Sequence, residues 1–306
     1  MICKNIVEFL LWNDCIAHGK CAFCWQQARH DCTKFLDEEN KLNSINCVRE
    51  FLKTRFDSSD GIKKDNTGNH ILLVGGEIFD IELESVKKSL CDLLEYIVSL
   101  MSNNDIELLY INTNLLYTDL TLLYKLLNLI KKFELFDRLR FTTSWDLVGR
   151  FETEEKKERF DKNIREIRKD FPEAHIVVNM ILTKQMCNEI IGNPTFIRSF
   201  QEKYDVQVNT IPYIVLKDWM CPTKAEVMNA LLAINNDIPN YIRDYATNFS
   251  LPQRKDLYEY NSIDKQLIYC SSDIDSCGHS VNFKNYCTDK SKCYLCDIIQ
   301  LMEEVE

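Results

Sequence analysis

The sequence predicts an α/β protein, a partial (β/α)6 TIM-like barrel with a parallel sheet, followed by a small cysteine-rich, metal-binding extension. Two observations predict the barrel: short apolar runs alternate six times with segments of helical periodicity, and the connections between them are short. The extension is predicted by a third observation, namely that five cysteines lie between residues 262 and 306. We therefore expect the barrel over residues 1–238 and the extension over residues 239–306.

The six strand–helix units follow one another in a regular order. The first strand, 6–12, leads directly into a loop with three cysteines, and the second, 71–74, is a continuous apolar run typical of a buried parallel strand. The other strands are predicted at 107–112, 140–144, 175–182 and 206–211, and the helices at 37–56, 81–101, 120–133, 152–169, 193–203 and 224–235. In such folds the chemistry lies at the carboxyl ends of the strands. After residue 239 we expect only short helical or irregular pieces.

Length and composition narrow the class of protein. A chain of 306 residues, 45 % of them hydrophobic, can bury a full core. Its formal net charge of −10 argues against general nucleic-acid binding, which needs a basic face to neutralise phosphates. No apolar run reaches membrane-spanning length, and the first residues lack the cleavage site of a secretory signal. We expect a cytoplasmic protein with no membrane association.

Fourteen cysteines are too many for an ordinary cytosolic enzyme, and their clustering at the two ends of the chain favours metal coordination over disulfides. The first group is Cys15, Cys21 and Cys24, in the loop after the first strand. Three thiolates can hold a 4Fe-4S cluster with one iron left open, whereas the same thiolates together with His18 can form a tetrahedral zinc site. The loop alone does not distinguish between a 4Fe-4S cluster and a zinc ion.

The loop, the strand order and a glycine motif together resemble the radical S-adenosylmethionine enzymes, over roughly residues 6–222. Cys21-Ala22-Phe23-Cys24 matches the second half of that family's usual C-x3-C-x2-C loop, although the first gap here is two residues longer. Gly75-Gly76-Glu77 after the second strand resembles the family's GGE motif, in which glycine permits a ligand close to the main chain. Thr113-Asn114 resembles its T-N-G segment, with Leu115 in place of the glycine.

The resemblance implies an oxygen-sensitive enzyme with two cofactors, a 4Fe-4S cluster on the three cysteines and S-adenosylmethionine on the open iron. An electron from a donor such as a flavodoxin or ferredoxin then cleaves S-adenosylmethionine to a 5′-deoxyadenosyl radical, which abstracts a substrate hydrogen. The residues expected to contact the cofactor are Phe23, Gly75, Gly76, Glu77, Thr113, Asn114, Ser144, Asp146, Arg150 and Asn179.

The second group of cysteines predicts another metal site in the extension. Cys293 and Cys296 form a C-x2-C chelate. Two assignments stay open: an auxiliary iron-sulfur cluster, as in the SPASM or twitch extensions that the tail resembles in shortened form, and a structural zinc. The candidate ligands are Cys277, His279, Cys287, Cys293 and Cys296, with Cys270 as a substitute for Cys287.

The sequence does not identify the substrate. Auxiliary-cluster tails are frequent in the peptide-modifying members of the family, which favours a peptide or protein side chain. Only fourteen residues precede Cys15, which we expect to leave no room for an amino-terminal peptide-recognition domain, so a nucleoside or small metabolite stays open. The non-catalytic alternative is a zinc-stabilised binding protein. Cys221, just after the sixth strand, is the candidate for a catalytic hydrogen donor, with a buried structural thiol as the alternative.

Overall fold

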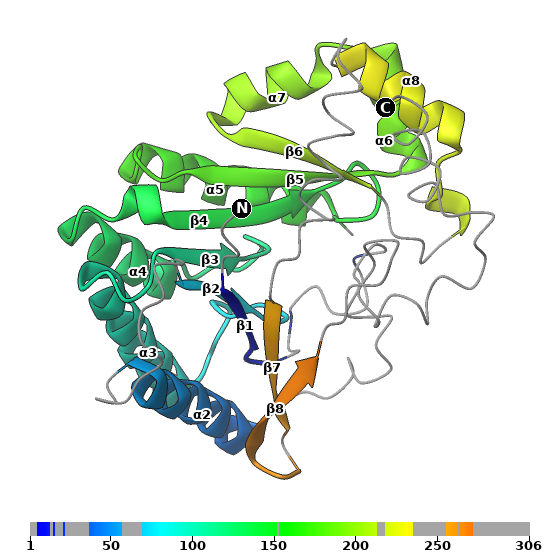
Figure 1. Cartoon of the computed structure of the whole chain (residues 1–306). Coiled ribbons are helices and arrows are strands. Elements are labelled where there is room, and N and C mark those ends of the chain that lie inside the picture. Colours follow the sequence, from blue (N-terminus) through cyan, green and yellow to red (C-terminus); the bar gives the residue numbers. More distant parts are fainter. Residues whose placement is uncertain are drawn as a thin grey trace.

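The computed structural model describes residues 5–12, 15, 21, 37–56, 69–151, 153–212, 218–234, 255–261 and 263–271. The described strands form one sheet in the order β6-β5-β4-β3-β2-β1-β7-β8, in which every neighbouring pair is parallel except β7 and β8 (Figure 1). The strands are β1 Asn5–Leu10, β2 Asn69–Val74, β3 Leu108–Asn112, β4 Leu139–Trp145, β5 Ile176–Leu182, β6 Gln207–Pro212, β7 Lys255–Asn261 and β8 Gln266–Ser271.

Helices connect the parallel strands. They are α2 Glu38–Phe56, α3 Glu84–Ser102, α4 Thr121–Lys132, α5 Glu154–Asp170, α6 Lys184–Gly192, α7 Phe196–Tyr204 and α8 Lys224–Ile234, with short 3₁₀ helices η1 Phe136–Arg138 and η2 Asp218–Met220. The α/β class and the predicted strand–helix alternation are therefore confirmed. The sequential order of β1 to β6 is consistent with a partial TIM-like barrel. None of the described helices is long and apolar enough to cross a membrane.

One helix was not expected between β5 and α7. The side chain of Thr183 starts α6, because its hydroxyl oxygen accepts a hydrogen bond from the Met186 N–H at 3.2 Å. The helix has only nine residues, and only Met186, Cys187 and Ile190 are buried, so its apolar pattern is too short to stand out in the sequence.

The expectation of only irregular pieces after residue 239 is wrong for residues 255–271. These residues form the hairpin β7–β8, and β7 pairs in parallel with β1, where Ile6 faces Lys255. The turn between the two strands is held by Asn261, whose side chain accepts a hydrogen bond from the Ile263 N–H at 2.9 Å. The predicted boundary after residue 238 lies outside the described residues, but the hairpin beyond it extends the same sheet as the barrel strands.

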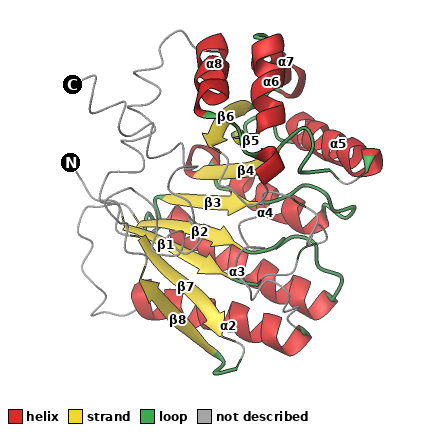
Figure 2. Ribbon diagram, turned by 90° about the vertical axis from the view of Figure 1, so that its right-hand side faces the viewer, coloured by secondary structure: helices red, strands yellow, loops and turns green. Residues whose placement is uncertain are grey.

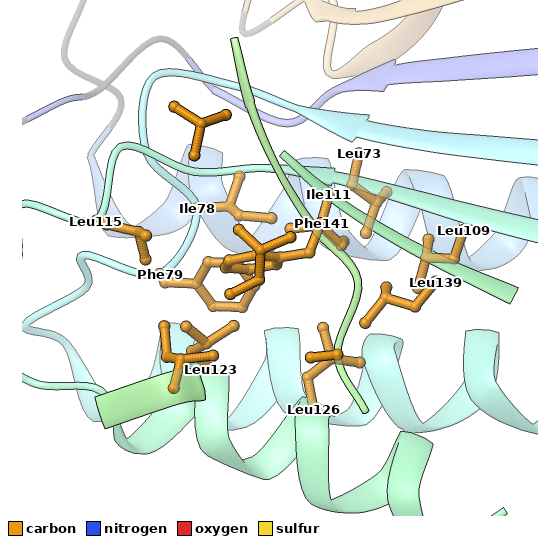
Figure 3. Packing of buried hydrophobic residues seen from close by; sticks show 14 of the residues in the cluster. Leu73, Ile78, Phe79, Leu109, Ile111, Leu115, Leu123, Leu126, Leu139 and Phe141 are labelled. Carbon is orange, nitrogen blue, oxygen red and sulfur yellow. The ribbon is translucent and has the colours of Figure 1, made fainter. Parts of the chain in front are cut away.

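Helices α2 to α5 cover one face of the sheet (Figures 1 and 2). The apolar core fills the space between them, with Leu73, Ile111 and Phe141 from the strands packing near Leu123 and Leu126 of α4 (Figure 3). Each such side chain is fully buried and stabilises the fold by about 1.5–3 kcal/mol.

The opposite face of strands β3 to β6, which points away from α2–α5, is here called the inner face. Burial alternates along β4, where the core-facing residues are buried and the residues between them are only half-buried. Strand β4 thus has one buried, mostly apolar face and one face that remains partly accessible.

Candidate metal and cofactor site

The carboxyl ends of β1, β3 and β4 bring together four residues that were predicted to bind metal or cofactor. Asn114 Nδ2 donates a hydrogen bond to the Cys15 sulfur at 3.3 Å, and Arg150 Nη2 donates to the Asn114 carbonyl oxygen at 3.0 Å. Arg150 Nη1 lies 3.8 Å from the Cys21 sulfur, which is in hydrogen-bond reach for a sulfur acceptor. Asn114 and Arg150 therefore connect the first two predicted cluster ligands.

The other predicted metal ligands lie outside the described residues: Cys24 of the first loop, and Cys277, His279, Cys287, Cys293 and Cys296 of the extension. The predicted cofactor contact Phe23 also lies outside them. In the described part of the chain, no three Cys, His, Asp or Glu side chains are grouped closely enough to hold a metal ion. Cys270, the substitute ligand, lies in β8. The ligand sets of both metal sites remain predictions.

The glycine motif packs against the end of β1, where the cysteine loop begins. The Gly76 N–H donates a hydrogen bond to the Trp12 carbonyl oxygen at 2.8 Å, and a Cβ atom added to Gly75 would lie 2.8 Å from the same oxygen. Such a contact is too close for any real side chain, so Gly75 is required for the two loops to approach each other. Trp12 Nε1 donates in turn to the Glu77 carbonyl oxygen at 3.1 Å.

The Glu77 carboxylate is 1 % exposed and binds the loop after β3. Its Oε2 accepts hydrogen bonds from the Thr113 hydroxyl at 2.9 Å and the Asn114 N–H at 2.5 Å, and its Oε1 accepts from the Phe79 N–H at 3.1 Å. Burial raises the pKa of Glu77 to about 7, although these hydrogen bonds lower it. The side chain of this motif residue therefore positions Asn114.

The loop after β3 is fixed at two further points. Asn114 Oδ1 accepts a hydrogen bond from the Leu116 N–H at 2.7 Å, which orients the carboxamide so that its nitrogen faces Cys15. Leu115 adopts φ 57°, the left-handed region that favours glycine, while its side chain is fully buried. A glycine would adopt this positive φ without strain, and glycine is the residue at this position in the T-N-G segment that the loop resembles.

The Asp146 carboxylate fixes the loop after β4, as the Glu77 carboxylate fixes the loop after β3. Its side chain is fully buried, and Oδ2 accepts hydrogen bonds from the Gly149 N–H at 2.6 Å and the Val148 N–H at 3.2 Å. The Thr183 hydroxyl donates to Oδ1 at 2.9 Å. Burial raises the pKa of Asp146, and the hydrogen bonds oppose that shift. Because Arg150 directly follows this loop, Asp146 and Thr183 together position the guanidinium.

Ser144 and Asn179 lie side by side on the inner face, since they are paired in register between β4 and β5, and both are half-buried. Cys221 is half-buried just after η2, and its thiol lies 3.7 Å from the Pro222 carbonyl oxygen. The structure thus links Glu77, Asn114 and Arg150 to Cys15 and Cys21, whereas in the described part of the chain Ser144 and Asn179 make no hydrogen bond to this group, and the role of Cys221 remains a prediction.

Sequence reasoning missed two contributors to the site. The sequence does not mark Thr183 as a site residue, because a threonine before a helix is a common N-cap. Polar residues at alternate positions of the later strands did give a signal that could have been used, for Asn112, Thr142, Gln207 and Asn209 all point to the inner face. No protein-family model matches the chain, and no curated protein matches it either.

Proposed function

We propose that the chain is a radical S-adenosylmethionine enzyme, with a 4Fe-4S cluster on Cys15, Cys21 and Cys24. The observation that carries the proposal is the contact of Asn114 and Arg150 with the first two of these cysteines, at the carboxyl ends of parallel strands. A zinc site formed only by the cysteine loop needs no such support from β3 and β4.

The residues present fit an anionic cofactor. The Arg150 side chain is 7 % exposed, and its buried Nε has no hydrogen-bond partner in the described part of the chain. Burying a guanidinium is costly unless an anion compensates its charge. A thiolate-bound cluster or the carboxylate of S-adenosylmethionine would supply that anion, so the arrangement favours both proposed cofactors.

When both are bound, the cofactors supply a 5′-deoxyadenosyl radical that can abstract a substrate hydrogen. The protein's own residues fix the site. Glu77 holds the backbone of the Asn114 loop, Asp146 holds the loop before Arg150, and Gly75 allows the glycine motif to reach the end of β1. These buried contacts hold the site residues in fixed positions, which is how a protein aims a reactive group.

The test is anaerobic reconstitution with iron and sulfide, followed by dithionite and S-adenosylmethionine. We expect 5′-deoxyadenosine and methionine to form, and Cys21→Ala to abolish both products together with most of the bound iron. Cys91→Ala on α3 is the matched control, because Cys91 is a half-buried thiol outside the site, and it should retain iron and activity. If wild type forms neither product and binds zinc through the same cysteines, the enzyme proposal is wrong and the chain is a zinc-stabilised binding protein.

We also propose that the extension holds a second metal on its cysteines, either an auxiliary iron-sulfur cluster or zinc. Metal analysis after reconstitution separates the two. A 4Fe-4S cluster in each site gives about eight irons per chain, whereas one cluster and a structural zinc give about four irons and one zinc.

A further inference from the structure

We infer that the inner face of β3 to β6 binds the substrate, and that the substrate presents an extended, uncharged stretch of peptide backbone there. The inference rests on the proposed function, and it identifies the chemical class of the substrate. Six uncharged hydrogen-bonding side chains of this face are here called the polar row: Asn112, Thr142, Ser144, Asn179, Gln207 and Asn209.

Strand register places these six side chains on one surface. Asn112 pairs with Thr142 across β3 and β4, and two residues later along β4 Ser144 pairs with Asn179 of β5. Asn179 in turn pairs with Asn209 of β6. Paired residues of parallel strands point to the same side, and so do residues two apart in one strand, so the polar row is continuous across four strands.

The composition of the polar row is unusual for a parallel sheet. Asparagine is depleted in strands, and strands of parallel sheets usually read as apolar on both faces. Here three asparagines and a glutamine occupy the inner face, while the other face of the same strands carries buried residues such as Ile111, Phe141 and Val178. Residue types that strands disfavour, on a face that does not belong to the apolar core, are expected at a functional site.

The polar row is also accessible. Asn112, Gln207 and Asn209 are exposed, and Thr142, Ser144 and Asn179 are half-buried. Some of its members already contact one another: the Thr142 hydroxyl hydrogen-bonds Asn112 Oδ1, and Gln207 Nε2 donates to Asn209 Oδ1 at 3.3 Å. Each of these contacts uses only part of the hydrogen-bonding capacity of a carboxamide, which has two donors and two acceptor sites.

The chemistry of the polar row selects the ligand. None of its six side chains is charged or aromatic. Tyr110 and Arg140 pair on the same face two residues before Asn112 and Thr142, and Arg140 Nη1 donates to the Asp137 carbonyl oxygen at 2.9 Å. The polar row itself therefore offers neither a counter-ion for a phosphate nor a ring on which a nucleobase can stack. Carboxamides both donate and accept, as the peptide bond does. The polar row spans three inter-strand spacings, about 14 Å, which matches about four residues of extended peptide.

The position of the polar row agrees with this role. Asn112 lies two residues before Asn114, which contacts Cys15, so a chain lying along the polar row reaches the candidate cofactor site. Ser144 and Asn179, which lie in the middle of the polar row, are also predicted cofactor contacts. The variants that test substrate binding are therefore placed at its two ends.

The experiment measures binding of random, uncharged hexapeptides, acetylated and amidated at their ends, to the full chain by affinity selection and mass spectrometry. A panel of nucleosides is tested in parallel. We expect wild type to retain peptides, and Asn112→Leu and Asn209→Leu each to weaken their binding about tenfold, which corresponds to one lost hydrogen bond of about 1.4 kcal/mol. Methylation of the backbone nitrogens of a retained peptide should weaken its binding to wild type by at least as much.

Asn128→Leu is the matched control, because Asn128 is an exposed asparagine of α4 on the other side of the sheet, and it should leave peptide binding unchanged. Asn112→Asp, which removes a donor with almost no change of shape, replaces Asn112→Leu if the leucine variant does not fold. Retention of nucleosides but no peptide overturns the inference, as does peptide binding that both end variants leave unchanged. Binding requires no iron or S-adenosylmethionine, so this result is independent of whether 5′-deoxyadenosine forms.

Discussion

The backbone N–H of Asn114 donates a 2.5 Å hydrogen bond to Oε2 of Glu77, so a carboxylate in the loop after β2 fixes the residue that contacts Cys15. A side chain with this role is sensitive to its own protonation, because it is 1 % exposed and burial raises its pKa to about 7. In the unfolded chain the same group has its ordinary pKa of 4.5.

The first prediction concerns pH and the free energy of unfolding. Between pH 4.5 and 7 the folded state binds more protons at Glu77 than the unfolded state does, so the stabilising contribution of this group is complete below pH 4.5 and is lost as pH rises through 7. The loss amounts to about 3 kcal/mol at most. We expect the free energy of unfolding, measured with urea, to change less between pH 5 and pH 8 in Glu77→Gln than in wild type. Equal differences in the two proteins would contradict this assignment.

A second prediction tests the backbone conformation of Leu115. Both Leu115→Ala and Leu115→Gly lose a buried side chain, at about 3 kcal/mol, but only glycine relieves the strain of a positive φ. We expect the glycine variant to be about 1 kcal/mol more stable than the alanine variant, measured by urea unfolding.

The matched control for Leu115 is Leu126, which is equally buried but lies inside α4. There the order should reverse, since glycine destabilises a helix interior by about 1 kcal/mol relative to alanine. The same order at both positions would show that the strain at Leu115 is not significant.

The third prediction is energetic coupling between Asp146 and Thr183. Each side chain is fully buried, and they share a 2.9 Å hydrogen bond. A double-mutant cycle with Asp146→Asn and Thr183→Val should give a coupling energy of about 1 kcal/mol or more in unfolding experiments. The cycle of Asp146→Asn with Ser102→Ala, at the end of α3, should be additive. Additivity in both cycles would refute the proposed pairing.

The fourth prediction concerns the guanidinium of Arg150. Arg150→Lys keeps the charge but not the planar fork that reaches both the Asn114 carbonyl and the Cys21 sulfur. We expect the rate of 5′-deoxyadenosine formation to fall about tenfold or more, with the iron content largely retained. Arg165→Lys, an exposed arginine of α5, serves as the control and should keep the wild-type rate. An unchanged rate for Arg150→Lys would remove this residue from the site.

Much of the fold could be predicted from the sequence, because apolar runs such as 71–74 and helical stripes such as 81–101 report local structure directly. The grouping of site residues followed from one further rule, that the carboxyl ends of parallel strands meet at one edge. Neither the apolar pattern nor the position at a strand end predicts which side chains form a contact. The contact of Arg150 with Cys21 joins residues 129 positions apart, and no local pattern encodes it.

The roles of the two buried carboxylates also required the structure. Glu77 and Asp146 were predicted to contact the cofactor, and the sequence alone cannot distinguish a ligand from a side chain that holds its own or a neighbouring loop. The hairpin β7–β8 was missed for a different reason. Its strands follow a stretch without periodicity, and their pairing partner β1 lies at the other end of the chain.

The placement of that hairpin has a consequence for how the protein is made. The strand that carries the cysteine loop is translated before its neighbour β7, which follows about 250 residues later, a large sequence separation for two paired strands. Until the hairpin arrives, β1 is an edge strand with unpaired backbone groups, open to pairing with another nascent chain. Completion of the sheet, and with it protection of the strand beneath the cysteines, therefore waits until β7 has been translated.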